Sequence, residues 1–162
     1  MKEYRIEEMP GKKLVGKRMT MSFADDKTGE LWKSFMQQRR EIPDNINQEL
    51  ISMQIYPARF FTDFHPTTPF EKWAAAEVTD LENVPGGMET FILPEGLYLV
   101  FNYRGKTSDA APFFQNILGE WLPQSDFLLD DRPHFEVLGE KYMNDSPNSE
   151  EEIWIPVKEK HQ

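Results

Sequence analysis

The sequence predicts an α+β fold in which one strand–helix–strand–strand unit occurs twice. The same order of elements recurs in both halves, and corresponding elements lie about 80 residues apart. Turn residues bound short extended segments, which is typical of neighbouring antiparallel strands. We therefore expect one domain over residues 1–162, with pseudo-repeats at about 1–82 and 88–160. Its architecture should be a single curved antiparallel sheet with two helices on one face.

The first half supplies a strand, a helix and two further strands. Apolar and polar side chains alternate over residues 19–23, which is the period of a half-buried strand. Asp25 and Asp26 suit the start of a helix, which we expect from Lys27 to Arg40, before Pro43. Its apolar face consists of Leu31, Trp32, Phe35 and Met36. Strands are expected at 50–56 and 70–78, although the alanines at 74–76 favour a helix by propensity.

The second half repeats that order after the turn formed by residues 85–87. Residues 88–93 are extended, and residues 97–103 form a strand with few charges. A helix should run from Ala110 to Trp121, because apolar residues form one broad face and Pro123 ends it. Strands are then expected at 134–139 and 151–157.

Composition excludes several classes of function. The 162-residue chain has a formal net charge of −10, which disfavours direct binding to nucleic acid. It has no cysteine and three scattered histidines, so we expect no metal site, and no cofactor motif is present. No apolar run is long enough to cross a membrane, and the N-terminus lacks a signal peptide. The sequence thus predicts a soluble cytoplasmic protein.

The last predicted strand carries the most informative pattern. Ile153, Ile155 and Val157 share one face and belong on a core beneath helices. Glu152 and Trp154 share the opposite face. If that face lines a cavity, a carboxylate and an indole would attract a flat apolar or cationic molecule. A solvated acidic strand with one exposed tryptophan is the alternative.

The chain also resembles a known family. The segment ILPEGLYLVFNYRG at 92–105 is similar to the central strand motif of the GyrI-like (gyrase-inhibitor-like) small-molecule-binding family, which includes effector-binding domains of AraC-type regulators. Residues 121–125, 131–136 and 152–157 agree with it, as do Leu31, Trp32 and Phe35. The family's position that is often histidine is Tyr103 here. The resemblance implies a stand-alone member with the duplicated fold and a central ligand cleft between its halves.

The resemblance also implies site residues. Glu152 falls at the family's buried acidic position, and Trp154 would line the same cleft. Tyr56 and Trp73 are expected on first-half strands that face the cleft. An unusually apolar loop contains Phe60, Phe61 and Phe64. This loop could form a lid over the ligand or pack into a small separate core, and both interpretations are open. The aromatic residues of the helices are expected in the core.

These features lead to one principal function and two alternatives. We expect the chain to bind a small aromatic, amphipathic or cationic compound, for sensing, sequestration or detoxification. The first alternative is a hydrolase that opens the cyclopropane ring of DNA-alkylating natural products, with Glu152 as the catalytic base. The second alternative, also suggested by the resemblance, is a gyrase-modulating protein-interaction module.

Overall fold

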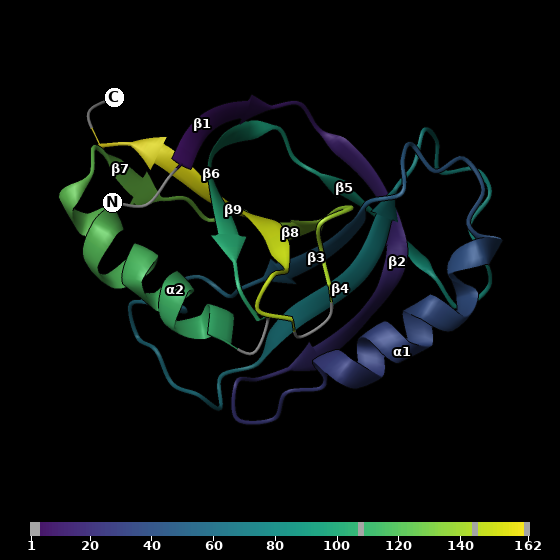
Figure 1. Ribbon diagram of the computed structural model, residues 1–162, viewed down its shortest axis with the longest axis horizontal. Coiled ribbons are helices and arrows are strands. Elements are labelled where there is room, and N and C mark those ends of the chain that lie inside the picture. The colour runs from purple at the N-terminus through teal and green to yellow at the C-terminus, as the bar shows by residue number, and fades with distance from the viewer. Residues whose placement is uncertain (1–3, 107–108, 144–145, 161–162) are drawn as a thin grey trace.

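The computed structural model describes residues 4–106, 109–143 and 146–160. Nine strands and two α-helices make up most of this part of the chain (Figure 1). The strands are β1 (Tyr4–Met9), β2 (Lys12–Met21), β3 (Leu50–Ile55), β4 (Phe70–Glu77), β5 (Glu89–Leu93), β6 (Gly96–Arg104), β7 (Phe127–Leu129), β8 (His134–Leu138) and β9 (Glu150–Glu159). The helices are α1 (Thr28–Gln38) and α2 (Ala110–Asn116). Short helical turns follow them at Arg39–Glu41, Ile117–Trp121 and Leu122–Gln124.

The strand order is symmetric about its central pair. The sheet runs β1-β6-β9-β8-β3-β4-β2-β5, and β7 pairs with β9 outside this path. Reading outward from the β8–β3 pair, the series β3, β4, β2, β5 is matched by β8, β9, β6, β1. All registered pairs are antiparallel. The expected α+β fold with a duplicated unit is confirmed.

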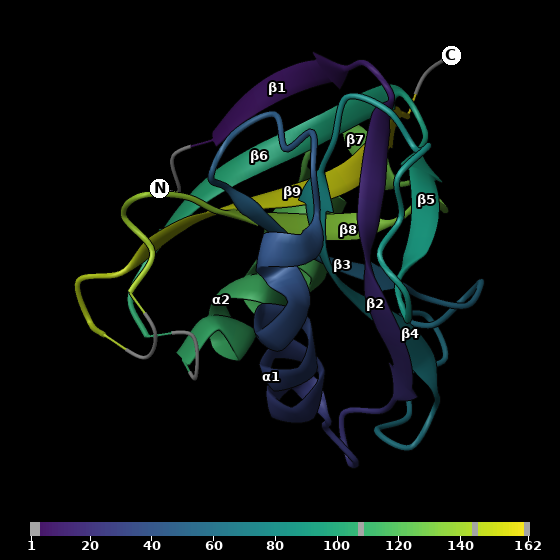
Figure 2. The ribbon, with the colours of Figure 1, turned by 90° about the vertical axis from the view of Figure 1, so that its right-hand side faces the viewer.

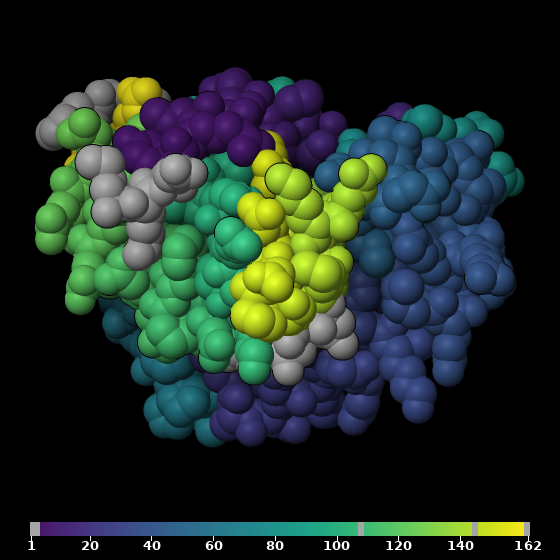
Figure 3. All heavy atoms as spheres, in the orientation of Figure 1, coloured from purple at the N-terminus to yellow at the C-terminus, as the bar shows by residue number. Residues whose placement is uncertain are grey.

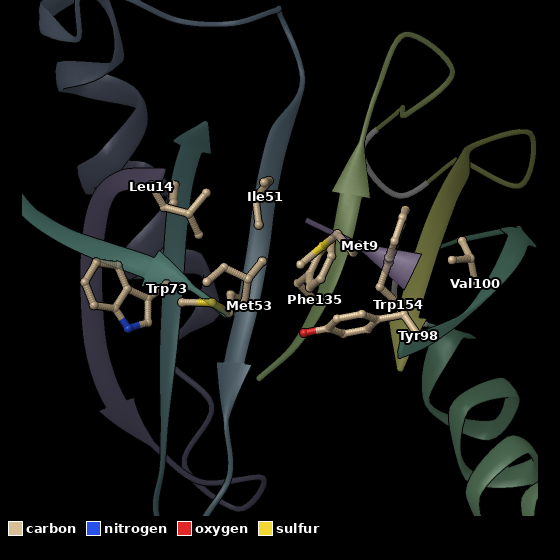
Figure 4. Packing of buried hydrophobic residues seen from close by; sticks show 11 residues of the cluster. Met9, Leu14, Ile51, Met53, Trp73, Tyr98, Val100, Phe135 and Trp154 are labelled. Carbon is tan, nitrogen blue, oxygen red and sulfur yellow. The ribbon is translucent and has the colours of Figure 1, made fainter. Parts of the chain in front are cut away.

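One face of the curved sheet, called the inner face here, closes on its own core. Its buried side chains come from β1, β2, β3, β4, β5, β6, β8 and β9 and contact one another (Figure 4). They include Met53, Trp73, Tyr98, Phe135 and Trp154. Side chains from so many strands meet only because the sheet curls around them. This face therefore needs no helix to cover it.

The other face, called the outer face here, carries both helices (Figures 1 and 2). Leu31 and Phe35 of α1 pack on side chains of β2 and β4. Ile117, in the turn that extends α2, packs on side chains of β6 and β9. The predicted helix from Lys27 begins at Thr28, and the predicted helix from Ala110 to Trp121 is α2 with its π-helical turn. The placement of two helices on one face is thus confirmed.

The predicted strands are also confirmed, including the alanine-rich one. Ala74 and Ala76 lie on the outer face of β4 beneath α1, whereas Ala75 lies on the inner face. Small side chains let the helix pack closely on this strand, so tertiary packing overrides their helical propensity. Among the described residues, no helix combines the length and apolar character needed to cross a membrane.

Candidate functional site

A cavity of about 740 Å³ lies between the two helices, above the central strands of the outer face. Its walls include Trp32 and Met36 of α1 and Phe114 of α2. Between β8 and β9, residues 139–143 and 146–149 lie on the surface between the helices (Figure 3), and Tyr142 also lines the cavity. The helices are held apart because each packs on its own half of the sheet. We call this cavity the cleft.

The floor of the cleft carries five polar side chains among apolar ones from β3, β4, β8 and β9. The polar residues are Ser52, Gln54, Lys72, Glu136 and Glu151. These polar residues lie on the outer face because strand side chains alternate between the faces. Glu151, for example, is two residues before Ile153, and both point to the side that carries the helices.

Burial dominates the electrostatics of Glu151. Its residue surface is only 8% exposed. Burial, reinforced by the nearby Glu136 carboxyl and opposed by Lys72, raises the pKa of Glu151 to about 8. Within the described residues, no side chain donates a hydrogen bond that would offset this burial. Among the described residues, the carboxyl therefore has no cationic side chain within ion-pair distance.

The neighbouring polar groups are better satisfied. Gln54 Nε2 donates a hydrogen bond of 3.1 Å to Glu136 Oε1. Burial raises the pKa of Glu136, while Lys72 and this hydrogen bond act in the opposite direction. Lys72 Nζ donates to Thr28 Oγ1 at 3.2 Å. Glu136 thus has a hydrogen-bond donor, whereas Glu151 has none among the described side chains.

Aromatic rings close one end of the cleft. Tyr56 lines the cavity and contacts Phe60, Phe61 and His134, with ring centroids 4.8–5.0 Å apart. Phe61 also contacts Phe114 of α2, so the loop after β3 reaches the helix of the other half. Burial raises the pKa of the Tyr56 phenol well above its ordinary value, which keeps the ring neutral.

The predicted residues Glu152 and Trp154 lie outside the cleft. Both point to the inner face, where Trp154 belongs to the core and donates from Nε1 to Glu152 Oε1 at 3.1 Å. Glu152 also pairs with Arg5 at 2.8 Å. The predicted division of the strand into two faces was correct, but the cavity lies on the isoleucine face. Trp154 is enclosed by the side chains of the curled sheet, whereas Glu152 lines a second pocket together with Asn102 and Val137.

The other predicted residues divide between the cleft and its surroundings. Tyr56 lines the cleft, whereas Trp73 belongs to the inner core. Phe60 is buried beneath the rings of the loop and packs in the core under α1. Phe61 is partly buried behind Tyr56. Neither phenylalanine lines the cavity, although both support the ring that does.

The sequence reasoning missed the three charged residues of the floor and most of the aromatic walls, among them Trp32 and Phe114. Lys72, Glu136 and Glu151 each occur in phase with the apolar side chains beneath the helices. A charged residue in phase with a buried face is a usable signal, because such positions are seldom charged without a reason. Trp32 and Phe114 gave no such signal, because an aromatic wall and an aromatic core have the same helical spacing.

Comparisons with known proteins agree with this architecture. A family model described as the GyrI-like small molecule binding domain matches residues 2–158. The transcriptional regulator BrlR of Pseudomonas aeruginosa is 29% identical over 154 residues, covering 94% of this chain and 54% of the regulator. The chain thus spans about half the length of this relative.

Two solved structures share the fold at low sequence identity. SAV2435 bound to tetraphenylphosphonium has a TM-score of 0.73 at 17% identity and covers 96% of this chain and 94% of its own. The C-terminal domain of EcmrR has a TM-score of 0.74 at 15% identity, with 98% and 99% covered. Because the family match runs through nearly the whole sequence, the chain belongs to the GyrI-like small-molecule-binding family.

Proposed function

We propose that the chain binds a lipophilic aromatic cation in the cleft, with Glu151 as the counter-ion. The observation that carries this proposal is a nearly buried carboxyl, without a hydrogen-bond donor among the described side chains, in a largely apolar cavity. A bound cation would restore the electrostatic partner that burial removes. Sensing, sequestration and detoxification are all roles that such binding serves.

The cleft walls suit the rest of such a ligand. Trp32, Tyr56 and Phe114 offer aromatic faces and edges for stacking and for cation–π attraction. The cavity volume lies within the range of sites for drug-sized molecules. The structural neighbour SAV2435 has been solved with tetraphenylphosphonium, a cation surrounded by four phenyl rings. That compound is therefore the appropriate first probe.

Glu151→Gln should weaken tetraphenylphosphonium binding about tenfold at pH 8.5, because it removes the charge and keeps the shape. Isothermal titration calorimetry measures the change. Glu152→Gln is the matched control, since it alters the adjacent residue on the inner face, and it should leave the affinity unchanged. Neutral triphenylphosphine oxide should bind the wild type and Glu151→Gln equally.

The opposite pattern would refute this assignment. If Glu152→Gln weakens binding and Glu151→Gln does not, the ligand contacts the inner face. Equal losses for the cation and the neutral compound would mean that Glu151 shapes the cleft without pairing with charge.

Hydrolysis is a second candidate, because Glu151 and Glu136 place two carboxyls with raised pKa values in one apolar cleft. In this geometry Glu151, and not Glu152, is the candidate base.

The binding proposal makes a distinct prediction: a cyclopropane-containing alkylating compound in excess should yield at most one equivalent of ring-opened product by mass spectrometry. Multiple turnovers that Glu151→Gln abolishes would establish the hydrolase instead.

A further inference from the structure

Within the part of the chain that the structure describes, one cation of the cleft has no carboxylate in contact with it. Lys72 of β4 lines the floor, and among the described residues its ammonium group donates a hydrogen bond to the neutral Thr28 hydroxyl, at 3.2 Å. No described acidic side chain lies within ion-pair distance of its ammonium group. An ammonium group carries three donors, so two remain for another acceptor.

There is room for such an acceptor beside Lys72. Thr28 and Gly29, at the start of α1, line the same part of the cleft. A Cβ added to Gly29 would meet no atom within 4 Å. The carboxylate of nearby Asp26 already accepts from Thr28 N at 2.9 Å and from Thr28 Oγ1 at 2.5 Å. The first turn of a helix also favours negative charge.

Lys72 and Glu151 occupy equivalent positions in the two halves. Across the central strands, Ser52 pairs with Ala74 of β4, and Glu136 pairs with Ile153 of β9. Lys72 lies two residues before Ala74, and Glu151 lies two residues before Ile153. Both side chains are on the outer face. Their strands are three strand spacings apart, which is about 14 Å. The two halves thus present opposite charges on opposite sides of one floor.

We propose that the cleft selects a zwitterionic aromatic molecule, whose cationic group lies near Glu151 and whose anionic group pairs with Lys72. This inference rests on the proposed function and adds to it a second, anionic group on the ligand. A simple cation satisfies Glu151 but leaves Lys72 as a like charge in the same cavity. A ligand with both charges satisfies both residues.

Rhodamine 110 and rhodamine 123 form a matched pair of probes. Rhodamine 110 carries a cationic ring system and a free carboxylate, and rhodamine 123 is its methyl ester with the positive charge alone. Fluorescence anisotropy measures both affinities under the same conditions. The wild-type protein should bind rhodamine 110 about three- to tenfold more tightly. Lys72→Met should weaken rhodamine 110 binding about tenfold and leave rhodamine 123 unchanged or tighter.

Lys17→Met is the control, because Lys17 also donates to a hydroxyl of α1, at 2.8 Å to Ser34, yet does not line the cleft. It should preserve the ratio of the two affinities. Lys72→Arg should retain the preference for rhodamine 110. If Lys72→Met does not fold, Lys72→Gln takes its place in the same measurements.

Equal losses of both dyes in Lys72→Met would overturn the proposal, as would a wild-type protein that binds only the ester. A cleft that accepts tetraphenylphosphonium but neither dye would also overturn it. If tetraphenylphosphonium itself does not bind, the proposed cation site is wrong. If it binds through Glu151 while the dyes are not distinguished, only the zwitterion inference fails.

Discussion

Tetraphenylphosphonium should bind about tenfold more tightly at pH 9 than at pH 6. Burial and the neighbouring Glu136 raise the pKa of Glu151 to about 8, so the unliganded carboxyl is mostly protonated at pH 6. A cation binds the ionised form more tightly, so binding favours loss of the proton. The apparent affinity should rise by about this factor around the pKa of Glu151 and level off at lower and higher pH, because the neutral carboxyl, like the amide of Glu151→Gln, still binds about tenfold more weakly.

The other charged and titratable groups of the floor define the controls. Glu136 on β8 also has a raised pKa and contributes to the same titration, while Lys72 on β4 opposes both shifts. The Tyr56 phenol stays neutral, because burial raises its pKa well above the ordinary value. Glu151→Gln should remove most of the pH dependence, and Glu151→Gln with Glu136→Gln should remove the remainder. Calorimetric titrations from pH 6 to 9 with an unchanged affinity would contradict the assignment.

The fold was predictable because local patterns and turn residues agreed along the chain. Each strand was short and flanked by Gly, Pro or polar residues, and each helix had one apolar face. The pairing of β1 with β6 and of β2 with β5 was not predictable. It joins the first strands of each half to the opposite half, and such long-range pairing leaves no local signature.

The position of the ligand site was harder to predict because it depends on how the sheet curves. Alternation in β9 correctly separated Glu152 and Trp154 from Ile153 and Ile155. It did not say which face was closed by the sheet itself. Helices cover the isoleucine face only in part, so the space between them is open above β3 and β8. A carboxyl at position 151 reaches that space, whereas position 152 is on the wrong side.

Trp154→Ala should lower the free energy of unfolding by about 3–5 kcal/mol, because it removes a large side chain from the inner core. The indole is 9% exposed and stacks on Phe135, with ring centroids 5.1 Å apart and an interplanar angle of 18°. It also contacts Tyr98 at 5.8 Å between centroids. Urea unfolding followed by circular dichroism measures the loss.

The folded Trp154→Ala protein should still bind tetraphenylphosphonium normally, because the indole does not line the cleft. Trp32→Ala is the matched comparison, since Trp32 is partly buried on α1 and forms a cleft wall. Trp32→Ala should weaken tetraphenylphosphonium binding about tenfold, as expected for the loss of an aromatic contact. It should lower the free energy of unfolding by less than Trp154→Ala does. If Trp154→Ala kept its stability and lost the ligand, the aromatic pocket would have to lie on the inner face. The cleft between the helices would then not be the binding site.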